Sequence, residues 1–421
     1  MIELSLTLCL GIIAGIMAGL LPGIPIFLGF LLFLPFVPAD PLMLLIYGIV
    51  MNIGTQFFGS MSALYFKVPG ESSSYPVLIE INNLRTPEKL HHAILLTSLG
   101  SLIGTIVAAL GICLAISTGV FNGLYMPILL KLFLFLLLVI FSVTATKNYQ
   151  CNFLLLVFCS LFVFYPEISA ESKGILPAYY FNNMLALIIV FAMQLFWKEK
   201  DSLKKTISVR STLPVINQIP MMLKYSVIGT LFGLIPQLGA TISSYAGYAW
   251  EKFRKRDTFS RITASETTNS SAIIFSWFPL LLFGVPITAT EILLLQQLNS
   301  FGLSLSIINS SSAQWQLLFA MIVSGVIFYV LSVMINHNFY NVLGKVITQR
   351  WFTLSLVLLS VGMFYFLNHY LWRFIITHAL IFVPISWLIH RFKLSIITIV
   401  IALLLMKDIL FTTLQAIQIY F

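Results

Sequence analysis

The sequence is poor in charged residues. Only 9% of its 421 residues are Asp, Glu, Lys or Arg, whereas about a quarter is usual in a soluble domain, and 59% are hydrophobic. No polar stretch is long enough to form a soluble domain. The composition therefore favours a membrane protein. At roughly 30–35 residues for one helix and its loop, the length allows about a dozen crossings.

Cysteine is also scarce, and the usual catalytic and metal-binding spacings are missing. The four cysteines lie in or beside apolar runs, where structural thiols are expected. We find no nucleophile elbow, no HExxH and no phosphate-cradling GxxxxGK. The net charge of +9 comes from short loops, which membrane topology explains better than nucleic-acid binding. We expect no enzyme activity, no cofactor, no bound metal and no nucleic-acid partner.

Proline and glycine interrupt the apolar runs in a pattern that repeats. The run from Gly15 to Pro25 contains the break Pro22-Gly23. The pattern returns in the second half of the chain, from Gly229 to Gly239, with Pro236 in the place of Pro22. Irregular backbone at membrane depth is tolerated only where protein or a wet cavity satisfies its polar groups. Paired breaks are typical of secondary transporters, whose sites lie where interrupted helices meet.

A second pair of breaks recurs between the two halves of the chain. Pro69-Gly70 corresponds to Pro286-Ile287, and Asn52 corresponds to Asn269 with the same offset. Each proline removes a backbone donor and frees a carbonyl that can hold a cation. The helix that starts after a break presents unpaired N–H groups, which attract anions. The breaks therefore predict a site for an ion and an anion.

Glycines at helical spacing accompany the first pair of breaks. Gly11, Gly15 and Gly19 form one GxxxG series, and Gly229 and Gly233 form another. Small residues at this spacing let two helix backbones approach closely. Packing alone is the default explanation, so we expect a close helix contact at each series.

We expect an all-α polytopic membrane protein made of two inverted repeats. The strongly polar segment 198–212 is predicted to be a cytoplasmic linker between a first repeat, 1–197, and a second repeat, 213–421. Lys and Arg gather in alternate loops, which sets the orientation. This scheme gives each repeat a re-entrant or broken helical hairpin, a broken crossing helix and about four further transmembrane helices. The hairpins are expected at 4–37 and 214–250, and the broken crossings at 42–84 and 262–300.

Hydroxyl groups and one acid follow each second break. They are Glu71, Ser72 and Ser73 in the first half and Thr288, Thr290 and Glu291 in the second. Hydroxyls at a helix start cap the helix or bind a carboxylate ligand. Both interpretations stay open.

Two further charges lie in apolar surroundings, where charge is costly and usually functional. Glu266 lies in the second predicted broken crossing, and Lys67 directly precedes the first Val-Pro break. Lys67 needs a partner, which is Glu71 one turn on or Glu291 across the repeat. Substrate binding and a structural ion pair are both open for Lys67.

Several stretches resemble the large membrane subunit (TctA-like) of the tripartite tricarboxylate transporter family. The segment 58–63, with Gly59 and Ser60, is similar to that family's YGGSxSA, and 68–70 to its IPG. The segments 229–252, 266–271 and 279–286 are similar to GxxxGxxPGxG…Y…EK, EAxNNA and PLLxLGIP. The chain departs from these patterns at Gln237, Leu238 and Ser270, as a diverged member would.

The resemblance implies an ion-coupled secondary transporter, the permease subunit for small carboxylates such as tricarboxylates or dicarboxylates, with alternating access of the elevator type. The driving ion would be sodium or a proton. The implied partners are the lipid bilayer, a small membrane subunit and a periplasmic binding protein. The implied location is the bacterial inner (cytoplasmic) membrane, and a homodimer is a further expectation.

Two other function classes stay open. One is an intramembrane enzyme that uses Glu266, His91 or Glu291 on a lipid-linked substrate, and the other is a channel. Equivalent asparagines in the two halves favour transport over the enzyme.

A geometric problem concerns the depth of the predicted site. A continuous helix from Asn52 to Pro69 would be about 25 Å long. Asn52 and Pro69 can therefore share one depth in the membrane only if the chain breaks near 54–60. Otherwise Asn52 and Asn269 serve another layer of the site.

Overall fold

The computed structural model describes residues 2–20, 29–30, 33–66, 72–84, 86–118, 128–144, 148–164, 185–186, 189–190, 193, 216–305, 310–334, 355 and 372–420. Every regular element within these residues is a helix. The chain forms two compact units. Unit 1 comprises Met1–Asn122, Asp201–Leu282 and Leu305–Thr348, and unit 2 comprises Gly123–Lys200, Phe283–Ser304 and Gln349–Phe421.

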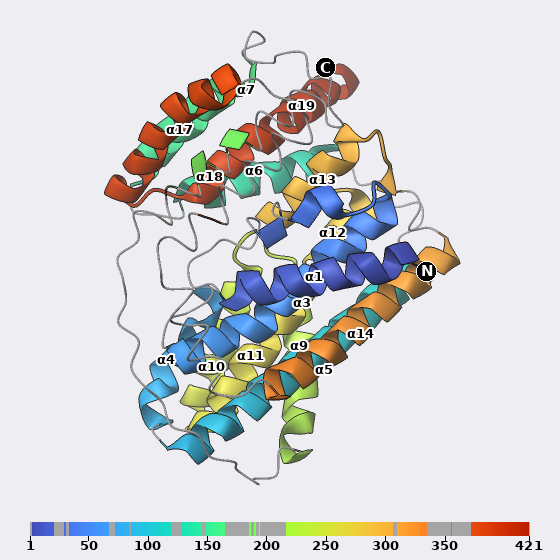
Figure 1. Cartoon of the computed structure of the whole chain (residues 1–421), viewed down its shortest axis with the longest axis vertical. Coiled ribbons are helices and arrows are strands. Elements are labelled where there is room, and N and C mark those ends of the chain that lie inside the picture. The colour runs from blue at the N-terminus through green and yellow to red at the C-terminus, as the bar shows by residue number, and fades with distance from the viewer. Residues whose placement is uncertain are drawn as a thin grey trace. The chain divides into compact units, whose positions relative to one another are not determined.

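Unit 1 holds most of the long helices (Figure 1). Its helices are α1 (Ile2–Leu20), α3 (Pro41–Phe66), α4 (Tyr75–Glu80), α5 (Pro87–Ser117), α9 (Ile219–Gly233), α10 (Gly239–Phe253), α11 (Thr258–Phe275), α12 (Trp277–Phe283, at the boundary) and α14 (Ser311–Met334). Short 3-10 turns lie at Leu34–Phe36, Ser72–Ser74, Ile81–Asn83 and Ile216–Gln218.

Unit 2 is also helical. Its helices are α6 (Ile128–Thr144), α7 (Tyr149–Phe164), α13 (Ala289–Ser300), α17 (Trp372–Phe392), α18 (Ile396–Val400) and α19 (Met406–Tyr420), and a π-helical turn (Ile401–Leu405) joins the last two.

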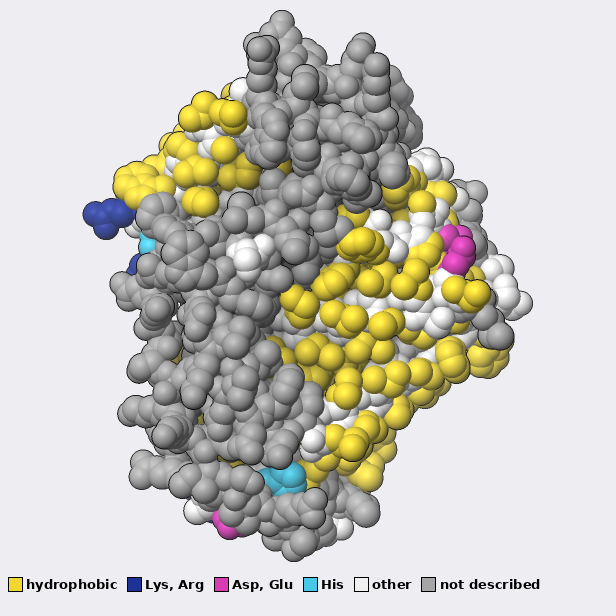
Figure 2. Space-filling model, viewed as in Figure 1, with side chains coloured by type: hydrophobic (Ala, Val, Ile, Leu, Met, Phe, Trp, Pro, Cys, Tyr) yellow, Lys and Arg dark blue, Asp and Glu magenta, His cyan; other side chains and the backbone are white. Residues whose placement is uncertain are grey.

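Among the described residues, four helices are long and apolar enough to cross a membrane, and all four belong to unit 1: α1, α3, α5 and α14. Shorter apolar helices lie at 219–233 in unit 1 and at 135–144, 149–161 and 376–392 in unit 2. Figure 2 shows hydrophobic side chains covering the face over α1 and α14. Exposed apolar side chains of these two helices include Leu6, Ile13, Phe319 and Val326. Such a face suits lipid. The predicted all-α polytopic membrane protein is confirmed.

Two of the predicted breaks lie within the described residues. Helix α9 ends at Gly233 and α10 begins at Gly239, with Gln237 at φ 62° in the intervening turn. Helix α12 ends at Phe283 and α13 begins at Ala289, so the chain leaves the helix around Pro286. The breaks predicted at Pro22-Gly23 and at Pro69-Gly70 lie outside the described residues.

Helix α3 settles the geometric problem raised by the sequence. It runs without interruption from Pro41 to Phe66, so the chain does not break between residues 54 and 60. The corresponding segment of the second half does break, at Ser276 between α11 and α12. Asn52 therefore lies more than three helical turns from the end of α3, and Pro69 lies outside the described residues.

The two glycine series make equivalent helix contacts. A Cβ on Gly15 would lie 2.8 Å from the Met51 carbonyl oxygen and 2.9 Å from Gly54 Cα, on α3. A Cβ on Gly229 would meet Thr268 and Ser271, on α11, at 2.9 Å from Thr268 Cα. Thr268 corresponds to Met51, and Ser271 to Gly54, by the same sequence spacing that relates Asn269 to Asn52. The expected close contact is confirmed in both places, and its partners repeat as the sequence predicts.

Gly229→Val is expected to destabilise the protein strongly. The added side chain would overlap the backbone of Thr268, which cannot rotate away as a flexible side chain can. Overpacking of this kind costs about 1–3 kcal/mol or more. Thermal unfolding of the detergent-purified chain measures the effect. Leu231→Val, two residues on and 68% exposed, is the control and should stay within about 0.5 kcal/mol of wild type.

The predicted repeat boundary stays a prediction. The linker 198–212 lies outside the described residues. Each compact unit combines segments from both sides of that linker. Contacts therefore join the two halves of the chain within a unit, as interlocked repeats require.

Candidate functional site

Helices α3 and α11 lie against each other at the centre of unit 1. The Ser60 hydroxyl donates a hydrogen bond to Glu266 Oε2 across this contact. Earlier on α3, a Cβ on Gly48 would lie 2.7 Å from the ring of Trp277, just beyond the end of α11. A later residue of α3 thus meets an earlier one of α11, so the two helices run antiparallel. We call this contact the α3/α11 seam.

The α3/α11 seam is unusually polar for a buried position. Helix α11 carries many buried polar residues, all at most 7% exposed, and those from 265 to 271 are consecutive: Ser260, Thr263, Ser265, Glu266, Thr267, Thr268, Asn269, Ser270 and Ser271. Several hydroxyls bond to carbonyls of their own helix, as Thr268 does to Ala264 at 2.8 Å. Others cross to neighbours, as Ser270 does to Ser101 on α5 at 2.9 Å. A buried helix that is polar on every side indicates a role beyond packing.

Two asparagines on these helices keep amide atoms without a partner. Asn52 on α3 is 2% exposed and Asn269 on α11 is fully buried. Within the described part of the chain, Asn52 Oδ1 and both Asn269 Oδ1 and Nδ2 make no hydrogen bond. A buried amide without a partner costs about 1–3 kcal/mol. These atoms are therefore the clearest sign of a ligand, and they are the residues that the repeat offset singled out.

A second group of oxygens joins α10 to α11 beside Asn269. The Ser244 hydroxyl lies 2.8 Å from that of Ser265 and donates to the Ser73 carbonyl at 2.5 Å. Ser243 and Thr268 bond in the next turn, where the Thr268 hydroxyl donates to the Ser243 carbonyl at 3.0 Å. Ser244 on α10 thus bonds both to Ser73, which follows the first Val-Pro motif in the sequence, and to Ser265 on α11.

The start of α10 lies level with Asn269. Going back along α10, Gly247 packs beside Ala264, Ser244 bonds to Ser265, and Ser243 bonds to Thr268. The first turn of α10, which starts at Gly239, is therefore beside residues 269–272. Its N-cap, Leu238, makes no side-chain cap. The Gly239 N–H donates to the Ile235 carbonyl at 3.1 Å, so the feature of this turn that favours an anion is the positive end of the helix dipole.

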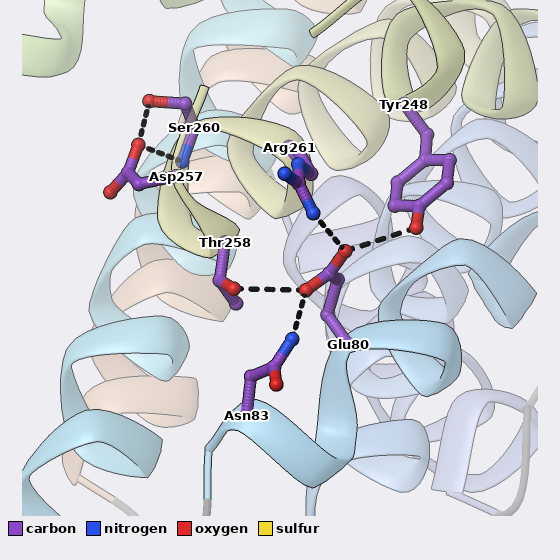
Figure 3. A network of polar contacts seen from close by, with 7 residues as sticks. All are labelled: Glu80, Asn83, Tyr248, Asp257, Thr258, Ser260 and Arg261. Carbon is purple, nitrogen blue, oxygen red and sulfur yellow. Dashed lines mark hydrogen bonds and ion pairs between the residues drawn. The ribbon is translucent and has the colours of Figure 1, made fainter. Parts of the chain in front are cut away.

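Glu80 collects four donors at the junction of α4, α10 and α11 (Figure 3). Its carboxylate is 3% exposed and accepts bonds from Arg261 at 2.9 Å, Tyr248 at 3.0 Å, Thr258 at 2.9 Å and Asn83 at 2.6 Å. Burial raises the pKa of Glu80, but these four bonds outweigh it and hold the pKa below its usual value. We call this group the Glu80 network.

The remaining predicted residues of the second break cap a helix. Thr288 and Glu291 form a capping box at the start of α13, in unit 2. Glu291 Oε2 accepts from the backbone N–H of Ile287 at 2.7 Å and of Thr288 at 3.2 Å. The capping interpretation is therefore confirmed for these two, and a binding role stays a prediction. Thr290 and Pro286 are buried beside them.

Other predicted site residues fall in three groups. Pro236 and Gly239 are buried at the α9–α10 break. Gly59 packs near the 3-10 turn Ser72–Ser74, where a Cβ would lie 3.5 Å from Ser74 Oγ, and Ser72 begins that turn. Pro22, Gly23, Lys67, Pro69, Gly70 and Glu71 lie outside the described residues.

Sequence reasoning missed the Glu80 network. Glu80 ends a short apolar run, and its partners Thr258 and Arg261 lie in a segment that the sequence marks only as a basic loop. Tyr248 lies in the segment 229–252, which the sequence distinguishes only by its resemblance to the family motif. An acid inside an apolar run was a usable signal, because such a charge needs a partner.

The polar groups of the α3/α11 seam are amides, hydroxyls and one carboxylate. These groups suit a carboxylate ligand or a hard cation. No group of three or more His, Cys, Asp or Glu that could hold a metal ion occurs in the described ranges.

Comparison with known proteins gives one match. The model of the tripartite tricarboxylate transporter TctA family matches residues 6–401, nearly the whole chain. Neither the curated proteins nor the solved structures contain a match.

Proposed function

The chain belongs to the tripartite tricarboxylate transporter TctA family, and we propose that it is the ion-coupled permease subunit for small carboxylates such as tricarboxylates or dicarboxylates. The observation that carries this proposal is a pair of buried asparagines, Asn52 on α3 and Asn269 on α11. In the described part of the chain, Asn52 Oδ1 and both Asn269 amide atoms have no hydrogen-bond partner. A transporter site must lose its ligand in each cycle, so it keeps polar groups that other proteins would satisfy internally.

The substrate carboxylate would meet Asn269 and the first turn of α10. Asn269 Nδ2 can donate to a carboxylate oxygen, and the positive end of the α10 dipole lies level with it. Both groups are neutral, so the empty site carries no cost of ion-pair desolvation. The same arrangement holds a carboxylate by donors alone and releases it without breaking a salt bridge.

Alternating access would exchange the two halves of the chain about a twofold axis. The antiparallel seam supports this. The sequence spacing that separates Asn52 from Asn269 also separates Ser60 from Trp277 and Ile49 from Glu266. Ile49 is the residue next to Gly48. The Ser60–Glu266 contact and the Gly48–Trp277 contact are thus nearly exchanged by the repeat offset. Inverted repeats of this kind support a rocking or elevator movement around a central site.

Partners and location follow from the family. A small membrane subunit and a periplasmic binding protein would deliver the carboxylate to this chain in the bacterial inner membrane. A homodimer would supply a fixed scaffold. Sodium or a proton would drive uptake.

No observation favours the enzyme. Glu291 is engaged in capping α13, Glu266 accepts from Ser60, and His91 lies on α5. The channel is separated from the transporter by stoichiometric ion coupling rather than by structure.

Uptake into proteoliposomes tests the proposal. Labelled citrate and C4-dicarboxylates are supplied with and without a sodium or proton gradient, in the presence of the partner subunits. We expect gradient-dependent accumulation of at least one carboxylate. Failure of every carboxylate under every gradient would rule the proposal out, and passive conductance without coupling would identify a channel.

A further inference from the structure

We infer that the Ser60–Glu266 contact and Asn269 form a binding site for a monovalent cation, most suitably Na⁺. The inference rests on the proposed function for its physiological meaning, since the cation would be the coupling ion. It adds the location of the ion, its ligands and its charge, which the family match does not supply.

Helical geometry brings the oxygens together. Asn269 follows Ser265 by four residues and Glu266 by three, so its side chain stands one turn above both on the same face of α11. Glu266 reaches across to Ser60 on α3, and Ser265 reaches across to Ser244 on α10. Asn269 therefore lies between the two neighbouring helices, above a pair of oxygen-bearing contacts. We call these five residues the oxygen cluster.

The unpartnered amide oxygen points to a cation rather than to packing. Asn269 is fully buried, and its Oδ1 is an acceptor without a donor in the described part of the chain. Carboxylate, amide and hydroxyl oxygens are the ligands that hard cations prefer. One cation bound to Oδ1 removes the cost of that buried acceptor without any rearrangement of α11.

Charge selects a monovalent ion. Among the five residues of the oxygen cluster, Glu266 is the one that carries a formal charge, and it is fully buried. One monovalent cation beside one carboxylate is neutral, whereas a divalent ion would leave a buried net charge. The hydroxyls of Ser60 and Ser265 supply neutral ligands.

One side chain would then link ion and substrate. Asn269 Oδ1 faces the cation while Nδ2 donates to the carboxylate, so each ligand orients the amide for the other. The affinity for carboxylate should rise with Na⁺, and the affinity for Na⁺ should rise with carboxylate by the same factor.

Sodium-dependent thermal stability tests the site without any transport step. The detergent-purified full chain is melted in NaCl and in choline chloride at equal ionic strength and pH, with no carboxylate present. We expect a saturable rise of the melting temperature with Na⁺, because a ligand that binds only the folded state stabilises it. Coincident curves for wild type in the two salts would overturn the inference.

Variants locate the ion. Asn269→Leu and Glu266→Gln should lose most of the Na⁺-dependent shift. Ser271→Ala, on the α9 side of the same helix and bonded to its own helix, should keep it. Should both site variants fail to fold, Ser60→Ala is expected to weaken the apparent Na⁺ affinity about tenfold. A full Na⁺ shift in folded Asn269→Leu or in Ser60→Ala would overturn the assignment.

The outcomes separate this inference from the proposed function. Uptake driven only by protons, with no Na⁺ shift, would overturn the cation site and leave the carboxylate permease intact. A Na⁺ shift that Asn269→Leu removes, without uptake of any carboxylate, would support the site and reject the permease.

Discussion

Asn269→Leu is expected to reduce carboxylate uptake at least tenfold while leaving the protein as stable as wild type or more stable. Leucine has a similar volume and removes an amide atom that has no partner in the described structure. That removal relieves a cost of about 1–3 kcal/mol. The lost bond to a charged ligand is worth about 1.5–3 kcal/mol, or roughly 10- to 100-fold in uptake efficiency. Thermal unfolding and proteoliposome uptake are measured on the same preparations.

Asn152→Leu is the matched control. Asn152 is buried too, but its amide donates to the Val143 carbonyl at 2.8 Å and accepts from the Ser395 N–H at 2.9 Å. Removing this amide leaves both partners unsatisfied, so stability should fall by about 1–3 kcal/mol. A loss of stability in Asn269→Leu equal to that in Asn152→Leu would show that Asn269 is a structural residue.

Glu80→Ala is expected to cost about 3–5 kcal/mol of stability, because it leaves Arg261 and three other donors without their common acceptor. The exposed acid Glu88, at the start of α5, offers the comparison, and Glu88→Ala should change stability by less than about 0.5 kcal/mol. The double variant Glu80→Leu/Arg261→Met should recover part of the loss. Equal melting temperatures for Glu80→Ala and Glu88→Ala would contradict a structural role for the network.

The charge of Glu80 also predicts a pH dependence. Because the folded-state pKa lies below the usual 4.5, the ionised network stabilises the protein above that value, and the contribution is lost as the pH falls below it. Glu80→Gln should therefore show a flatter stability profile than wild type on the acid side of pH 4.5. The pH profile of thermal unfolding measures this difference.

Much of the fold could be predicted because the membrane limits the choices. Apolar runs of sufficient length must be helices, since backbone groups in lipid have no other partners. The glycine series predicted the α1–α3 and α9–α11 contacts, because only residues without a side chain allow backbones so close. The break at Pro236 was visible for a similar reason, since proline cannot continue the hydrogen-bonding pattern.

The rest of the site depended on tertiary contacts that spacing does not reveal. The repeat offset paired Asn52 with Asn269, but only the structure places them on antiparallel helices. Glu291 looked like a ligand because it is an acid in an apolar run, yet it caps its own helix. Glu80 offered a local signal as an acid in an apolar run, but three of its four donors, Tyr248, Thr258 and Arg261, lie far along the chain and could not be predicted from spacing. Local patterns predicted where helices start and stop. Tertiary contacts between residues distant in sequence decided which polar residues remain available for a ligand.

The most direct test of a carboxylate site at the α3/α11 seam is an experimentally determined structure of the full chain in a lipid environment with Na⁺ and a bound carboxylate. We predict a carboxylate oxygen within hydrogen-bonding distance of Asn269 Nδ2, beside the first turn of α10. A carboxylate bound elsewhere, with the Asn52 and Asn269 amides still without polar partners, would contradict the account.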